Sequence, residues 1–147
     1  MDIATVEKMT YDWSAKRRLK YINSCTDPET LHGCVFNYNW SDGFAEPAAY
    51  INNPVCSLST ALQIFFDADG VRYLEDKNYE PEDWQEEWWE LIKALYKRIV
   101  AHDFPSAPIK FVPPITRVER YKMEKDLTDE ESVFYTPIDG VDCNIDV

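Results

Sequence analysis

Apolar residues recur at helical spacing along the first two thirds of the chain, and short turn motifs separate the stripes that they form. In residues 3–24, Tyr11, Ala15, Leu19 and Ile22 stand three or four positions apart, which places them on one helical face. This spacing predicts a single first helix across the whole of that range.

Local cap chemistry predicts where the next helices begin and end. Asp27 suits the position before a helix, where its carboxylate accepts a backbone N–H, and Pro28 suits the first helical turn. Pro47 stands at the start of another short apolar stripe, and Ser57 is a cap for the stripe that follows it. We expect Gly70 to end that fourth helix, because glycine readily adopts the left-handed conformation.

The clearest helical pattern begins near Pro81. Its apolar residues, spaced three or four positions apart, are Trp84, Trp88, Leu91, Leu95 and Ile99. Acidic residues crowd its first turns and basic residues its last, an order that complements the helix dipole. We therefore expect the tryptophan face to be buried, and the residues expected to face solvent are Glu82, Glu86, Glu90 and Lys97.

Prolines interrupt the pattern beyond residue 104. Residues 109–112 fit a short extended segment, whereas 115–125 suit either a helix or a strand. Thr128, with Glu131 three positions later, forms a capping box that predicts a further short helix. The tail from Thr136 is expected to pack loosely or fray.

A weak internal repeat appears at an offset of 31 residues, which aligns Leu31 with Leu62 and Cys34 with Phe65. Such an echo is typical of stacked helical pairs. The chain length of 147 residues suits one domain. The sequence therefore predicts a single, mostly α domain of packed helical hairpins, with a solenoid-like arrangement left open. Its helical core is expected at about 3–103 and an irregular, proline-rich C-terminal segment at about 104–147.

Charge defines the class of partner. The chain has 27 acidic and 15 basic residues, which gives a formal net charge of −12. This charge repels nucleic acid and anionic membrane surfaces and favours a basic protein partner. Lys16, Arg17 and Lys20 form a basic patch beside Trp13, which we interpret as a solvated face rather than a phosphate site.

The sequence offers no sign of secretion or of a cofactor. Its start lacks a basic-then-apolar signal pattern, and no apolar run approaches the roughly 18 residues of a membrane span. We therefore expect a cytoplasmic protein. The cysteines form no CxxC pair and histidines number only two, so we expect neither a metal nor a cofactor, but four free thiols at Cys25, Cys34, Cys56 and Cys143.

Three sequence patterns contain residue types that can bind a metal or act in catalysis, but a structural interpretation is favoured for each. Asp67-Ala68-Asp69-Gly70 resembles the start of a calcium loop, but the closing glutamate is missing, so a helix end is favoured. His32 and Cys34 lie two positions apart and do not face each other on a helix. Paired carboxylates are abundant, yet nothing distinguishes one pair, so no catalytic residue is predicted and a carboxylate-dependent hydrolase is the minor alternative.

The acidic residues concentrate in one segment, whose candidate partner-binding side chains are Glu75, Asp76, Glu80, Glu82, Asp83, Glu86, Glu87 and Glu90. The helix dipole accounts for a few acids in a first turn, but like charges four positions apart repel each other. A basic protein surface would relieve this repulsion. A second candidate surface is formed by Trp40, Asp42 and Asp67.

The central stretch resembles an uncharacterised family of small bacterial domains. The motifs that carry the resemblance are Leu31-His32, Asn37-Tyr38-Asn39-Trp40, Asp42-Gly43, Pro47, Asn53-Pro54-Val55-Cys56, Ala61-Leu62-Gln63-Ile64-Phe65 and Ala68-Asp69-Gly70. Ser41 departs from the acidic residue expected before Asp42. The resemblance implies a bacterial source and no known activity, and it leaves out the long acidic helix and the proline-rich tail.

Size, acidity and the lack of a catalytic signature also resemble the class of toxin-immunity proteins, many of which cover the active site of a basic toxin. We therefore expect an acidic protein-binding module of the immunity or antitoxin type, whose basic partner is a cognate toxin. An intracellular adaptor or scaffold is the alternative.

Overall fold

The computed structural model describes residues 1–147 and is mostly helical, which confirms the predicted fold class. The α-helices are α1 (Ile3–Tyr11), α2 (Ala15–Ser24), α3 (Pro28–Phe36), α4 (Ala45–Asn52), α5 (Leu58–Asp67), α6 (Val71–Glu75), α7 (Glu86–Val100) and α8 (Arg117–Asp126). The short 3₁₀-helices are η1 (Trp40–Asp42), η2 (Asp83–Gln85) and η3 (Glu130–Tyr135). No helix is both long and apolar enough to cross a bilayer.

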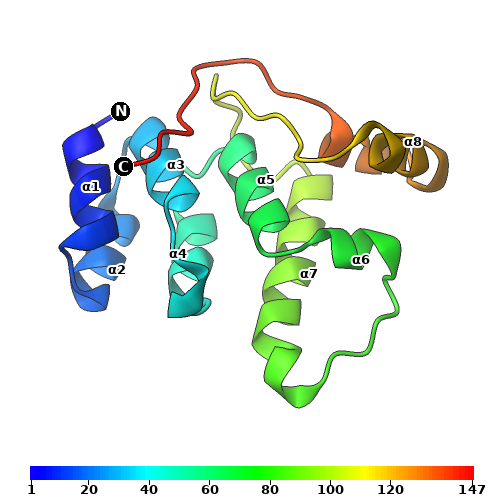
Figure 1. Ribbon diagram of the computed structural model, residues 1–147, viewed down its shortest axis with the longest axis horizontal. Helices are drawn as coiled ribbons and strands as arrows, with labels where there is room; N and C mark the ends of the chain where they lie inside the picture. Colours follow the sequence, from blue (N-terminus) through cyan, green and yellow to red (C-terminus); the bar gives the residue numbers. More distant parts are fainter.

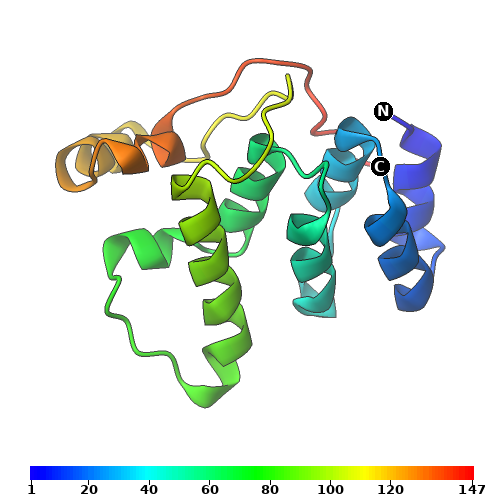
Figure 2. The same cartoon turned by 180° about the vertical axis from the view of Figure 1, so that it is seen from behind.

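The helices stack in two layers, as in a solenoid (Figures 1 and 2). One layer holds α1, α3 and α5, each packed on the next, and the other holds α2 and α4, with α7 beyond them. Arg98 on α7 ties the second layer together, because its guanidinium donates a hydrogen bond to the carbonyl of Ile51 on α4. The first pair, α1 and α2, forms one end of the stack.

The same cap recurs at the start of each helix of the first layer. Asp2 accepts from the backbone N–H of Thr5, and Ser57 accepts in the same way from Thr60. Asp27, the predicted cap of α3, accepts from its own first turn and holds the Thr30 hydroxyl. The repeated threonine also bonds the preceding helical unit, since Thr30 Oγ1 accepts from the N–H of Asp2 at 2.8 Å.

The internal echo is one residue out of register with this stacking. Leu31 and Leu62 are fully buried, and Cys34 and Phe65 are also in the core, but the caps Asp27 and Ser57 recur at an offset of 30 rather than 31. All four cysteines are buried, and all four carry free thiols.

The predicted single helix at 3–24 is wrong, because the chain breaks between α1 and α2. Ser14 adopts an extended conformation, and its hydroxyl accepts from the N–H of Arg17 to begin a second helix. The break removes the face predicted from spacing: Tyr11 is 69% exposed, whereas Ile22 is buried.

The prediction that Gly70 ends a helix by adopting the left-handed conformation is also wrong. α5 ends at Asp67, and the left-handed residue after it is Asp69, with a φ of 60°. Gly70 has a φ of −64° and begins α6. A Cβ at this position would lie 2.6 Å from the carbonyl oxygen of Phe65, so glycine is required by close approach rather than by conformation.

The long helix is present, but its tryptophan face differs from the prediction. Leu91, Leu95 and Ile99 are buried as expected, whereas Trp84 is 78% exposed and Trp88 is only half-buried. Helix α7 begins at Glu86, after the 3₁₀ turn that holds Trp84, so the helical spacing does not extend back to it. The fully packed tryptophan is Trp89. The predicted solvent-facing residues are exposed: Glu82, Glu86, Glu90 and Lys97.

The C-terminal segment is more ordered than predicted. Residues 115–125 form most of helix α8, and Phe111 pairs with Ile138 in an isolated β-bridge, which confirms a short extended segment. The capping box at Thr128 is present: its backbone N–H donates to the Glu131 carboxylate at 3.0 Å.

The tail does not fray but returns across the stack to end near the N-terminus (Figure 1). Cys143 is fully buried, and the Asn144 side chain bonds the ring of His32 at 2.8 Å. Asn37 donates to the carbonyl of Ile145 and accepts from the N–H of Val147. Side-chain hydrogen bonds to α3 and its C-cap therefore hold the last residues in place.

Candidate functional site: an acidic protein-binding surface

The acidic segment forms the projecting lower end of the molecule in Figure 1, where the chain leaves α6, runs through η2 and enters α7. All eight of its predicted binding residues are exposed: Glu75, Asp76, Glu80, Glu82, Asp83, Glu86, Glu87 and Glu90. We call this set the acidic turn. Their exposure agrees with the sequence-based expectation, although a longer helix was predicted there.

Almost none of this charge is neutralised within the chain. Only Glu90 forms an ion pair, with Lys93 one turn later, at 2.8 Å. Lys77 is the only basic residue of the segment, and its amine instead contacts Glu131 of η3 at 2.6 Å. Seven carboxylates of the acidic turn therefore lack a cationic partner, which leaves a strong negative potential at this end of the molecule.

Hydrogen bonds within the turn hold its shape. The side-chain oxygen of Gln85 accepts from the Tyr79 hydroxyl at 2.8 Å and from the N–H of Glu82 at 3.1 Å. The Glu82 carboxylate accepts from the Trp84 indole at 2.6 Å. These contacts preorganise the turn, so that little ordering would be needed on binding.

A groove of about 420 Å³ runs along the turn, and Lys93, the partner of Glu90, is among its lining residues. Its aromatic wall is Tyr79 and Trp89, whose rings lie 5.1 Å apart, and its rim carries the carboxylates of Glu82 and Glu86. An aromatic wall with an anionic rim suits the stem and head of a long cationic side chain.

A second hollow, of about 320 Å³, is lined by Trp84, Trp88 and Phe44, and also by Asp69 and Arg72. Phe44 packs on Trp40 at 6.3 Å, so the η1 turn adjoins this hollow. Trp40, predicted as part of a separate surface, is thus linked to the acidic turn through Phe44. Asp67 is exposed at the end of α5, where it accepts two hydrogen bonds from Gln63.

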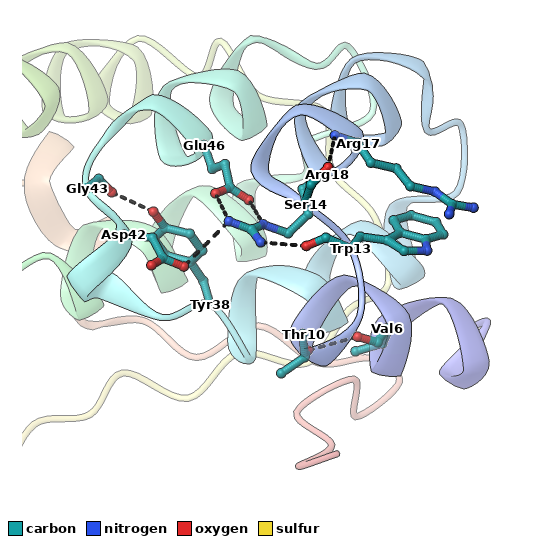
Figure 3. A network of polar contacts seen from close by, with 10 residues as sticks. All are labelled: Val6, Thr10, Trp13, Ser14, Arg17, Arg18, Tyr38, Asp42, Gly43 and Glu46. Carbon is teal, nitrogen blue, oxygen red and sulfur yellow. Dashed lines mark hydrogen bonds and ion pairs between the residues drawn. The ribbon is translucent and has the colours of Figure 1, made fainter.

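Asp42 is exposed and lies at the edge of a polar network between α2 and α4 (Figure 3). The Arg18 guanidinium donates two hydrogen bonds, of 2.7 and 2.9 Å, to the buried Glu46 carboxylate, and it lies 3.5 Å from the Asp42 carboxylate. It also donates to the carbonyl of Trp13 at 2.8 Å. The network therefore holds the α1–α2 pair against the α3–α4 pair.

The network also fixes the η1 turn. The Tyr38 hydroxyl donates to the carbonyl of Gly43 at 2.6 Å (Figure 3). Burial, together with the nearby Glu46 and Asp42 carboxylates, raises the pKa of Tyr38 to about 12, so it remains a donor at neutral pH. Sequence reasoning missed both Arg18 and Glu46. The available signal was Glu46 itself, a lone carboxylate on a helix of otherwise apolar and small residues.

The other sequence motifs have structural roles. His32 is fully buried, and its ring nitrogens contact the Thr60 hydroxyl at 2.9 Å and the Asn144 amide oxygen. Burial lowers the pKa of His32 and raises that of Cys34 to about 12, so the pair is neutral at physiological pH. Nowhere in the chain do three metal-ligating side chains come together.

A family model described as a domain of unknown function, DUF4274, matches residues 26–100, just over half of the chain. The chain belongs to the DUF4274 family. The matched region runs from the start of α3 to the end of α7, so the DUF4274 domain includes the acidic turn, which the sequence resemblance had left outside. No curated protein and no solved structure matches the chain.

Proposed function

We propose that this DUF4274 protein is an acidic protein-binding module of the immunity or antitoxin type, which captures a basic partner on the acidic turn and occludes that partner's active site. The observation that carries the proposal is Trp84: this side chain is 78% exposed and stands among carboxylates that have no cation. Large aromatic residues of this kind supply much of the binding energy in protein interfaces.

Electrostatics supports a basic partner. Glu86 lies four positions from Glu90 on α7, and such like-charge pairs repel on a helix. A lysine- or arginine-rich surface would remove this repulsion and would speed the encounter through long-range attraction. The cost of the repulsion within the free chain is thereby offset in the complex.

Occlusion requires shape and charge, but no chemistry in the blocking protein. The acidic turn projects from the stack (Figure 1), and its own hydrogen bonds fix it, so it suits insertion into a cationic cleft. Enzymes that act on nucleic acids have such clefts, because they bind phosphate backbones. A basic nuclease toxin is accordingly the partner class that we favour.

The test begins with recovery of the partner. The tagged chain and its Glu86→Lys, Glu90→Lys variant are each used to co-purify proteins from the native cell. A basic protein that the wild type retains and the variant loses is the expected result. A second variant, Glu7→Lys with Glu130→Lys, makes the same change in net charge at exposed acids outside the turn, and it should retain the partner.

Growth then tests the role of the complex. Expression of the recovered protein alone should stop growth, and co-expression of the wild-type chain should restore it, whereas the Glu86→Lys, Glu90→Lys variant should not. A partner that is harmless to the cell contradicts the immunity assignment. The adaptor alternative has support in the stacked helical pairs, an architecture that presents extended binding surfaces. It would be favoured if the wild type retained several unrelated proteins and the Glu86→Lys, Glu90→Lys variant lost all of them.

A further inference from the structure

The outer face of α2 is a cationic surface on this acidic protein. Between Trp13 and Ser24 there is no acidic residue, and Lys16, Arg17 and Lys20 are all exposed. Arg18, the fourth cation of the segment, is turned inward to Glu46, and none of the other three forms an ion pair. Three free positive charges therefore stand together at the end of the helical stack.

These cations border the roomiest hollow on the surface, an open groove of about 750 Å³. Its floor is aromatic: the rings of Trp13 and Tyr21 meet edge to face, 5.5 Å apart. The guanidinium of Arg17 lies over the Trp13 ring at 4.3 Å (Figure 3), which holds this long side chain along the groove. The groove thus offers apolar contact area within a cationic rim.

Packing leaves this face free. α2 packs on α4 through its inner side, and no further helix follows it at this end of the stack (Figures 1 and 2). A terminal helix of a solenoid normally presents a polar outer face, which explains polarity but not a uniform positive sign in a chain of net charge −12.

The matching surface is present on the same chain. The acidic turn carries seven carboxylates without a cation and one exposed aromatic side chain, Trp84. We propose that the α2 groove receives the acidic turn of a second copy of this chain. The carboxylates of one copy then meet Lys16, Arg17 and Lys20 of the next, and Trp84 covers the aromatic floor.

The two surfaces differ and lie apart on the molecule, with the α3–α4 pair between them (Figure 1). The contact is therefore heterologous, and it joins copies head to tail rather than as a symmetric dimer. Since both surfaces are charged, self-association strengthens as salt falls. It uses the same acidic turn as the proposed function but does not require that function, and a basic partner would compete with it.

Complementary variants test the proposal. Variant A carries Glu86→Gln and Glu87→Gln, which weaken the turn and leave the groove intact. Variant B carries Arg17→Gln and Lys20→Gln, which weaken the groove and leave the turn intact, and neither variant gains a charge that could attract the other's altered surface. Sedimentation velocity in low salt should show concentration-dependent oligomers for the wild type. Variant A alone, or variant B alone, should associate at least about tenfold more weakly.

The decisive sample is the mixture of A and B, in which one groove and one turn remain. It should form a dimer that contains one copy of each and grows no further, while circular dichroism shows both variants folded. Wild-type chain that stays monomeric at high concentration in low salt overturns the proposal, as does a folded A–B mixture that does not associate. Binding of a polyglutamate peptide to the groove without self-association also overturns it, in favour of a foreign acidic partner. Because B retains the acidic turn, its capture of the basic partner reports on the proposed function separately.

Discussion

Glu46 and Glu86 occupy equivalent places, each in the first turn of a helix, yet they have opposite surroundings. Glu46 is 4% exposed and is gripped by Arg18 through two hydrogen bonds. Glu86 is exposed on the acidic turn and forms no ion pair. The helix dipole favours both carboxylates, so it does not account for the difference.

The comparison separates two uses of charge in one small domain. At the α2–α4 contact, the Glu46 carboxylate is desolvated and paired, so its removal would leave the Arg18 guanidinium without its main partner. At the acidic turn, carboxylates stay hydrated and unpaired, so their loss leaves the fold intact and changes only how the surface meets other molecules. The first kind of charge holds the stack together, and the second is available for a partner.

One of the two largest expected effects is at the buried pair. Glu46→Ala should lower the free energy of unfolding by about 3 kcal/mol, because it removes both hydrogen bonds to the partly buried Arg18 guanidinium, which keeps only Asp42, at 3.5 Å. Glu86→Ala, the matched change on the acidic turn, should alter stability by less than about 0.5 kcal/mol. Urea denaturation of both variants measures the difference. Equal effects would show that the two regions do not differ in kind.

Trp84 of η2 and Trp89 of α7 give the same comparison with an apolar side chain. Trp89→Ala should cost about 3–4 kcal/mol, since the side chain is 4% exposed and packs on Tyr73 and Tyr79. Trp84→Ala should leave the thermal midpoint unchanged and weaken capture of the partner. A large loss of stability from Trp84→Ala would indicate a structural role for the turn.

A smaller effect should appear in acid. Burial acts to raise the pKa of Glu131, but hydrogen bonds from Lys77, Thr128 and Tyr96 outweigh it and lower that pKa from 4.5 to about 2. The stabilisation by Glu131 is therefore complete above pH 4.5 and is lost as pH falls toward 2. Unfolding free energies of the wild type and Glu131→Gln, measured through this window, should converge at its acidic end. A constant gap between the two curves would contradict the linkage.

The smallest effect on stability is expected from the acidic turn itself. Glu86→Lys with Glu90→Lys removes the Glu90–Lys93 ion pair, keeps a repelling like-charge pair and places cations in the first turns of α7, so the free energy of unfolding should fall, but by less than about 1 kcal/mol. Thermal unfolding in low and high salt checks this, because the loss should shrink as salt screens the charges. A much larger loss of stability would mean that these carboxylates have a further partner within the fold.

Features that depend on neighbouring residues could be predicted from the sequence. The caps at Asp27 and Ser57 and the capping box at Thr128 follow from hydrogen bonds between residues two or three positions apart, and all are present. The exposure of the acidic segment likewise follows from its charge, since so many carboxylates could not be buried unpaired.

Features that depend on distant residues could not be predicted. Arg18 meets Glu46 across 28 positions, and His32 meets Asn144 across 112, and no local pattern encodes either contact. Trp84 was misplaced for a related reason: spacing alone does not reveal that a 3₁₀ turn precedes α7 and rotates this side chain out of the helical register.

The most direct test of the central claim is the rate at which the recovered basic partner associates with the chain, measured by stopped-flow fluorescence in low and high salt. The acidic turn should accelerate capture, so Glu86→Lys with Glu90→Lys should slow association at least about tenfold in low salt, with a smaller difference in high salt. Association of this variant at the wild-type rate in low salt would contradict the account and move the search for the docking site to Trp40, Asp42 and Asp67.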